Sequence, residues 1–174
     1  MLRRILKIFW WLFLLGILTI YIYLGLASFT SQQVIAGVIK LEEAPGEIVY
    51  RSQQKLNDNL GNYWQVVLFK RIDSNSNKTS SINLRLVGFP GSQELPHPLP
   101  LKITTDTGKV LTAPDIFIDE APAPTIAQYD FKDVLTQLPT QELLIGIPVG
   151  KQNFINLSIP EYVVQEWQEI AIKS

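Results

Sequence analysis

The sequence of 174 residues contains no cysteine and only one histidine, His97. Without cysteine the chain can form no disulfide, no thiolate nucleophile and no cysteine metal site. One histidine provides too few nitrogen ligands for an ordinary zinc site. A serine triad would need a nucleophile elbow besides that histidine, and the sequence contains none. We therefore expect no catalytic residue, no metal site and no cofactor, and predict that the protein is not an enzyme.

Acidic residues are missing from the first 41 positions, where the only cations before a charge-free run at 8–39 are Arg3, Arg4 and Lys7. These three belong to the 15 Lys+Arg of the chain, so twelve remain against 16 Asp+Glu, and the rest of the chain carries about −4. Phosphate contacts require clustered lysine and arginine, which a mildly acidic domain does not offer. The charge pattern thus predicts no nucleic-acid partner.

The charge-free run is long enough to cross a membrane. Residues 8–29 would span roughly 33 Å as a helix, about the thickness of a hydrocarbon core. Cations before such a run hold its N-terminal end in the cytoplasm, so we expect the following domain on the opposite side. The membrane lipid would contact a helix that includes Trp10, Trp11, Leu14, Leu15, Leu18 and Phe29.

This apolar segment could be a retained anchor or a cleaved signal. Small residues at a spacing that suits a signal peptidase would allow cleavage after Ala27 or after Ala36. The apolar run is longer than the roughly 7–15 residues of a usual signal peptide, which favours a retained anchor. In either case the chain divides into an N-terminal segment, 1–36, and one extracytoplasmic domain, 37–174.

The remainder reads as short apolar runs separated by turn residues, which is typical of an antiparallel β domain. Hairpins are predicted for 47–71, for 101–112, and for 142–159 with its turn at 150–152. Apolar residues at 82, 84 and 86 alternate with polar ones and should face one core. We expect a mainly β (α+β) fold, either a sandwich or a small barrel, with two short helices.

The first helix is predicted within 130–139. Its apolar positions, Phe131, Val134, Leu135 and Leu138, have helical spacing, and Asp130 is placed to cap the start.

The second helix is predicted at the C-terminus, over 158–171. Ser158 and Glu161 have the spacing of a capping box, and Pro160 would lie in the first turn. One face of this helix, predicted to dock on the sheet, carries Val163, Val164, Trp167, Ile170 and Ala171.

Four segments, "EAPGEIVYRSQQKLNDNLGNYWQVVLFKR", "LRLVGFPG", "YDFKDVLTQLP" and "VVQEWQ", resemble the uncharacterised cyanobacterial family called domain of unknown function 3122. The resemblance covers nearly the whole domain after the apolar run. It implies a cyanobacterial exported protein in the periplasm or the thylakoid lumen. It implies no activity and no functional residue.

Asp106 lies in an Asp-Thr-Gly triplet, which bears the catalytic carboxylate of aspartic proteases. Those enzymes need two carboxylates that share a proton in a dry cleft, with bulky apolar residues before the aspartate. Here Thr104 and Thr105 precede it and Lys109 follows the glycine. The pattern therefore favours a hairpin turn, in which Asp106 starts the turn and Gly108 takes a positive φ.

His97, Asp119 and Glu120 are three further candidate site residues. His97 lies between prolines in "LPHPLP", where we expect a solvated loop histidine. Asp119 and Glu120 could bind calcium, but the spacing of an EF-hand is missing and a solvated acidic loop is favoured.

The leading hypothesis is a membrane-tethered, non-catalytic domain that binds or helps assemble an integral membrane protein complex. The alternative is a barrel-like carrier or sensor of a small apolar ligand, which a small β fold can enclose. A hydrolase that uses Asp106 is a remote third hypothesis.

Overall fold

A computed structural model describes the chain except residues 1–9, 12, 20–36, 77, 120 and 174. It divides into two compact units, Met1–Ile35 and Ala36–Ser174. In the first unit residues 10, 11 and 13–19 are helical. None of the helices in the described part of the chain combines the length and the hydropathy that a membrane crossing requires.

The predicted lipid-contacting residues belong to this first unit. Trp10, Trp11, Leu14, Leu15 and Leu18 are exposed. Phe29 and both predicted cleavage positions lie outside the described residues. The membrane anchor therefore stays a prediction from the sequence.

The second unit begins with a five-stranded antiparallel sheet in the order β1-β2-β3-β4-β7. Its strands are β1 (Ile39–Ala44), β2 (Glu47–Asn57), β3 (Tyr63–Asp73), β4 (Lys78–Gly88) and β7 (Ile126–Asp130). The three central strands have 11 residues each, and apolar and polar residues alternate over part of each strand.

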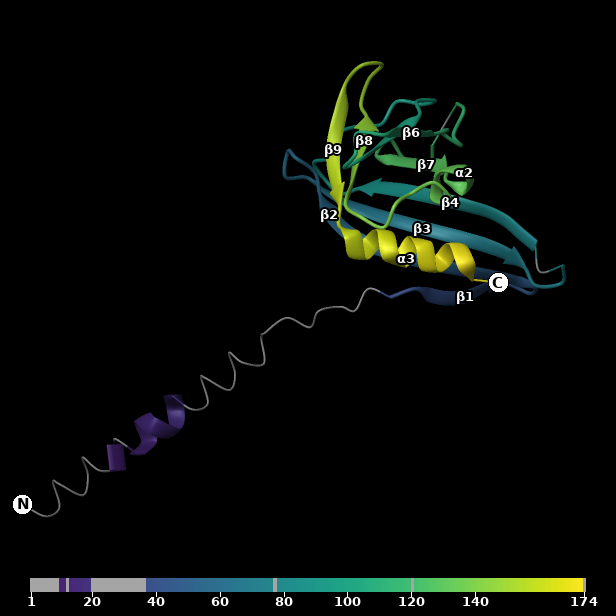
Figure 1. Cartoon of the computed structure of the whole chain (residues 1–174). Coiled ribbons are helices and arrows are strands. Elements are labelled where there is room, and N and C mark those ends of the chain that lie inside the picture. Colours follow the sequence, from purple (N-terminus) through teal and green to yellow (C-terminus); the bar gives the residue numbers. More distant parts are fainter. Residues whose placement is uncertain (1–9, 12, 20–36, 77, 120, 174) are drawn as a thin grey trace, which may run out of the picture. The chain divides into compact units, whose positions relative to one another are not determined.

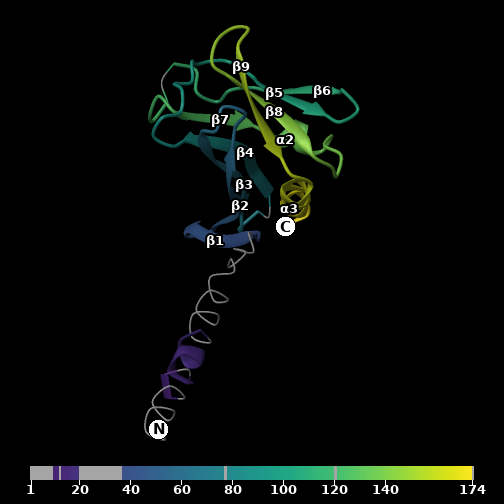
Figure 2. The same cartoon turned by 90° about the vertical axis from the view of Figure 1, so that its left-hand side faces the viewer.

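A four-stranded antiparallel sheet follows in the order β6-β5-β8-β9. Its strands are β5 (Leu101–Thr105), β6 (Val110–Ala113), β8 (Leu143–Pro148) and β9 (Phe154–Ile159). The three predicted hairpins are confirmed as β2–β3, β5–β6 and β8–β9. Figures 1 and 2 show two separate sheets, and the described strands form a sandwich rather than a closed barrel.

The hydrophobic core lies between the two sheets. Alternation along the long strands turns the even-numbered side chains of β2 and β3, and those of β4 from Ile82 onward, toward the core. Residues 82, 84 and 86 are buried as predicted. The opposite sheet contributes buried aliphatic residues from β5, β8 and β9. Burial of these side chains is the main stabilising contribution to the fold.

The C-terminal helix α3 (Glu161–Ile172) packs against β2 and β3 (Figure 1). Four of its five predicted core residues, from Val163 to Ile170, are buried, and Ala171 is partly buried. The predicted capping box is wrong: Pro160 is the N-cap and no side chain caps the helix. Ser158 instead belongs to β9, where its hydroxyl donates to Glu142 (2.5 Å), because strand pairing directs that side chain away from the helix start.

The internal helix α2 (Lys132–Leu135) is shorter than the pattern predicted. Phe131 rather than Asp130 is its N-cap, although the Asp130 carboxylate accepts a hydrogen bond from the Lys132 N–H (3.0 Å). Phe131 is fully buried and meets Trp167 edge to face, with ring centroids 5.6 Å apart. This contact fixes α2 against α3.

The inner face of the five-stranded sheet also carries polar side chains, and α3 provides partners for them. Glu166 of α3 accepts hydrogen bonds from the Ser52 hydroxyl (2.5 Å) and the Gln54 amide (3.0 Å). The Lys70 ammonium donates to the carbonyls of Ala171 (2.8 Å) and Lys173 (2.7 Å) at the helix C-terminus. A cation suits this position because the helix dipole is negative there.

The β2–β3 turn connects the two sheets. Asn59 donates its N–H to the Asn156 carbonyl (2.9 Å), and its side-chain oxygen accepts from the Asn156 N–H (3.0 Å). Within the turn the Asp58 carboxylate accepts bonds from the Trp64 indole (2.9 Å) and from the N–H groups of Leu60 (2.8 Å) and Asn62 (2.9 Å). These bonds anchor the turn on β9.

Candidate functional site

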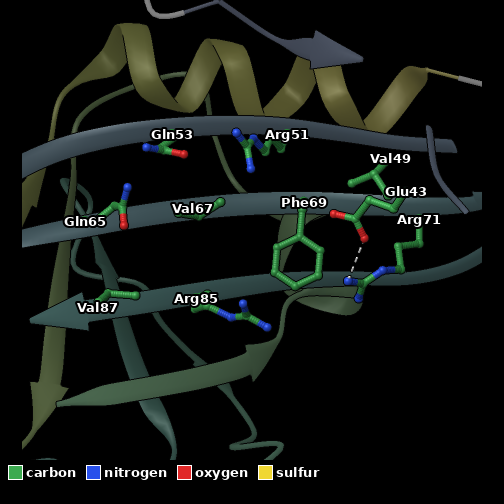
Figure 3. A pocket seen from close by; sticks show the side chains of 10 residues that line it. All are labelled: Glu43, Val49, Arg51, Gln53, Gln65, Val67, Phe69, Arg71, Arg85 and Val87. Carbon is green, nitrogen blue, oxygen red and sulfur yellow. Dashed lines mark hydrogen bonds and ion pairs between the residues drawn. The ribbon is translucent and has the colours of Figure 1, made fainter. Parts of the chain in front are cut away.

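The candidate site is a hollow on the outer face of the five-stranded sheet, which we call the outer-face hollow. It has a volume of about 330 Å³. Its lining comprises three arginines, three valines, two glutamines, a phenylalanine and a glutamate from β1 to β4 (Figure 3). The strand pairing explains this grouping, since the odd-numbered residues of β2, β3 and β4 share the outer face.

The floor of the outer-face hollow is apolar and largely shielded from water. Val49 is 1% exposed and Phe69 is 5% exposed, although both point away from the core between the sheets. The guanidinium of Arg71 lies 4.8 Å from the centre of the Phe69 ring, and that of Arg85 lies 5.4 Å from it. Cations over an aromatic face are attracted by the ring quadrupole, so Phe69 positions both arginines.

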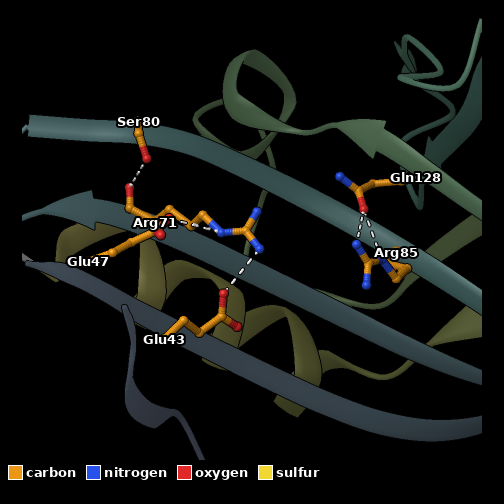
Figure 4. Close-up of polar contacts among 6 residues, drawn as sticks. All are labelled: Glu43, Glu47, Arg71, Ser80, Arg85 and Gln128. Carbon is orange, nitrogen blue, oxygen red and sulfur yellow. Dashed lines mark hydrogen bonds and ion pairs between the residues drawn. The ribbon is translucent and has the colours of Figure 1, made fainter. Parts of the chain in front are cut away.

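Arg71 is neutralised within the protein. Its guanidinium forms ion pairs with Glu43 (3.2 Å) and with Glu47 (3.2 Å), as Figure 4 shows. The hydroxyl of Ser80 donates to the Arg71 carbonyl (3.2 Å), which holds the backbone of β3 at this point. Arg71 therefore forms a fixed wall of the hollow.

Arg51 and Arg85 are placed differently, because neither has a carboxylate of the described residues within ion-pair distance. Arg85 donates from Nε (2.8 Å) and Nη2 (2.6 Å) to the amide oxygen of Gln128, which is a neutral acceptor (Figure 4). The Nε atom of Arg51 is buried and has no hydrogen-bond partner. Buried donors are normally paired, so the geometry leaves an acceptor missing beside Arg51.

The arrangement combines two uncompensated positive charges with an apolar floor and the amide groups of Gln53 and Gln65. Three long strands hold these groups, which makes the hollow a preformed site. Such a surface can bind a molecule that joins a negative group to an apolar part.

The residues considered from the sequence lie elsewhere. Asp106 is exposed in the β5–β6 turn, where the Gln141 amide donates to its carboxylate and Gly108 has a φ of 80°. This agrees with the turn interpretation of the triplet. Asp119 is exposed, and Glu120 lies outside the described residues. The described side chains include no cluster of three potential metal ligands.

The expectation that His97 is solvated is wrong. Its side chain is 8% exposed, and its Nδ1 lies 2.6 Å from the carboxylate of Asp115, whose side chain is 1% exposed. Asp115 also accepts the Phe117 N–H (3.0 Å), and the Phe117 ring packs edge-on against the imidazole. Burial and the Asp115 charge raise the pKa of the Tyr129 hydroxyl above its usual range. These contacts connect the loop before β5 to the segment before β7.

The outer-face hollow is not among the sites expected from the sequence. The one signal for it in the sequence is the set of three arginines in neighbouring strands. Arg51, Arg71 and Arg85 all occupy polar positions of alternating strands, where each one alone is an ordinary surface residue. Only the pairing of Arg51 with Phe69 and of Arg85 with Val67 brings the arginines together.

The structure thus defines a two-sheet antiparallel β protein with a docked C-terminal helix and a cationic hollow on one sheet. A family model described as "Protein of unknown function (DUF3122)" matches residues 36–170, and the chain belongs to this family. The resemblance to this family is therefore confirmed. Neither the curated proteins nor the solved structures provide a match to this chain.

Proposed function

We propose that this protein is a membrane-tethered, non-catalytic binding domain in the periplasm or thylakoid lumen of a cyanobacterium. It binds, or helps to assemble, an integral membrane protein complex. Its N-terminal apolar segment holds it at the membrane, and the outer-face hollow contacts the partner.

The observation that carries the proposal is a pair of arginines, Arg51 and Arg85, which have no carboxylate partner among the described residues and line one hollow with the buried Phe69. The domain after the apolar run carries about −4, with 16 Asp+Glu in the chain, so carboxylates are plentiful elsewhere on it. A donor that is buried without a partner is unfavourable for folding. Arginines whose charge and donors are not satisfied within the fold are better explained by a role in binding than by a role in stability.

A membrane tether would raise the local concentration of the domain near integral membrane partners, which supports the proposal. A domain held at the membrane surface meets integral partners at a high effective concentration, so an interface of modest area can suffice. The charge-free run at 8–39 and the cations before it are the basis for this part of the proposal.

The two other hypotheses have less support. A carrier of an apolar ligand needs an enclosed apolar cavity, whereas the outer-face hollow places arginine and glutamine beside its apolar floor and lies outside the core. A hydrolase needs a second carboxylate in a dry site, whereas Asp106 is exposed and bonded to an amide.

The test compares four forms of the full chain in the native host: wild type, Asp106→Asn, Asp119→Asn, and a form released into the same compartment by a cleavable signal. Co-purification of a membrane complex and growth complementation are the measurements. We expect both aspartate variants to behave as wild type and the released form to lose the complex. Should Asp106→Asn abolish complementation while the folded protein persists and the released form works, the proposal fails and an enzyme is the better hypothesis.

A further inference from the structure

We propose that the outer-face hollow recognises an extended acidic segment of a protein partner, one carboxylate of which binds between Arg51 and Arg85. This inference rests on the proposed function and names the chemistry by which the partner is recognised.

The two arginines are placed to hold one negative group. They lie on β2 and β4, on either side of β3, where Arg51 pairs with Phe69 and Arg85 with Val67. Standard strand spacing and rise put their Cα atoms roughly 12 Å apart. Figure 3 shows both side chains at the hollow, with Phe69 on the strand between them. Two long side chains can converge on one carboxylate across this distance.

A carboxylate matches the donors that the arginines offer. A guanidinium is a planar fork that binds a carboxylate through two parallel hydrogen bonds. Arg85 directs Nε and Nη2 at Gln128, so its other N–H groups are available. Arg51 also lines the hollow and has no carboxylate partner among the described residues, so a carboxylate in the hollow would meet a guanidinium whose charge is not compensated.

The remaining lining favours a peptide over a membrane surface. Val67 and Val87 offer apolar contact for side chains next to the carboxylate, and the Gln53 and Gln65 amides can bond to a peptide backbone. Glu43 lies in the same hollow as part of the Arg71 ion pair. A layer of lipid phosphates would place several negative charges near this glutamate, whereas the peptide places only one carboxylate in the hollow.

The experiment uses the full chain in nanodiscs of uncharged lipid and two labelled peptides. Each is a blocked seven-residue peptide of serine and valine with one central residue, glutamate in the first and glutamine in the second. Fluorescence anisotropy measures their affinity for wild type, Arg51→Gln and Arg85→Gln. Lys102→Gln is the matched control, since it removes an exposed cation from β5 of the other sheet. Melting temperatures verify that each variant is folded.

We expect the glutamate peptide to bind about tenfold more tightly than the glutamine peptide, and each arginine variant to lose about tenfold in affinity, one decade being 1.4 kcal/mol. Lys102→Gln should bind as wild type does. Equal affinity for both peptides, no binding of the glutamate peptide, or full affinity in both arginine variants would overturn the inference.

Two further arms separate other sources of a negative group. Inorganic phosphate and vesicles of phosphatidylglycerol are offered to the same variants. Arginine-dependent binding of the vesicles without binding of the glutamate peptide would overturn the inference in favour of a lipid headgroup. Competition by millimolar phosphate with no preference between the peptides would overturn it in favour of a free anion.

The outcome is also distinguishable from failure of the proposed function. If the Arg51→Gln/Arg85→Gln variant still co-purifies with the membrane complex, the proposal of a tethered binding domain stands, but contact through the outer-face hollow and this inference both fail. If the glutamate peptide binds as expected but no membrane complex accompanies the full chain, the inference about the hollow stands and the proposed function fails.

Discussion

The two faces of the five-stranded sheet both carry polar side chains, yet they differ in where the partners of those side chains lie. On the inner face, Ser52, Gln54 and Lys70 all bond to α3. On the outer face, Arg51 and Arg85 find no carboxylate among the described residues. Polar groups that the fold itself satisfies serve stability, whereas those left without a charged partner indicate binding. The comparison predicts that stability depends on the inner face and recognition on the outer face.

The largest expected effect is on the inner side, at Trp167 of α3. Trp167 is fully buried against Phe131, so Trp167→Ala should cost about 3–5 kcal/mol of the free energy of unfolding. Urea unfolding of the full chain measures the loss. Tyr162→Ala, on the exposed side of the same helix, is the control and should change it by less than about 0.5 kcal/mol. An unchanged urea midpoint for Trp167→Ala would mean that α3 does not stabilise the sheet.

A smaller effect is expected at Lys70, the buried cation of the inner face. Lys70→Met removes the ammonium that donates hydrogen bonds to the Ala171 and Lys173 carbonyls. The free energy of unfolding should fall by about 1–3 kcal/mol. Burial lowers the pKa of Lys70 because the charged form is poorly solvated there. Methionine avoids this desolvation cost, which offsets part of the loss in stability. Lys102→Met on the other sheet is the matched control with little expected effect. Equal stability of Lys70→Met and wild type in urea would contradict the role given to the inner face.

The smallest effect on stability is expected on the outer face. Arg85→Gln removes a cation over Phe69 and its bonds to Gln128, so the free energy of unfolding should fall by less than about 1 kcal/mol. The same urea titration measures this difference. A loss as large as that of Trp167→Ala would show that Arg85 serves the fold, and the division between the faces would be wrong.

The sequence predicted the parts of the fold that local patterns determine. Alternation in the long strands, turn residues in the hairpins and the apolar face of α3 are all local signals, and all three agree with the structure. β1 and β7 were missed for different reasons: β1 is exposed along its whole length, and β7 pairs with β4 across about 40 residues of chain. Neither feature leaves a pattern in a short window.

The candidate site was less predictable, because it depends on pairing between distant segments. His97 meets Asp115 across the β5–β6 hairpin that lies between them in the chain, so its burial could not be predicted from "LPHPLP". The arginines of the hollow likewise come from three strands. The sequence gives the type of each residue, but only the register of the sheet shows which residues lie next to one another in a site.

The turn that joins the two sheets also determines how the protein tolerates acid. Burial alone would raise the pKa of Asp58, but bonds from Trp64, Asn62 and Leu60 lower it below its usual value of 3.8. The folded state therefore binds this proton less readily than the unfolded chain does. The stabilising contribution of Asp58 is complete above the unfolded pKa and is lost only as the pH falls through the lowered one. We thus expect this contribution to persist in mild acid, with the urea midpoints of Asp58→Asn and wild type differing equally at pH 7 and pH 5 and approaching each other only as the pH falls below 3.8.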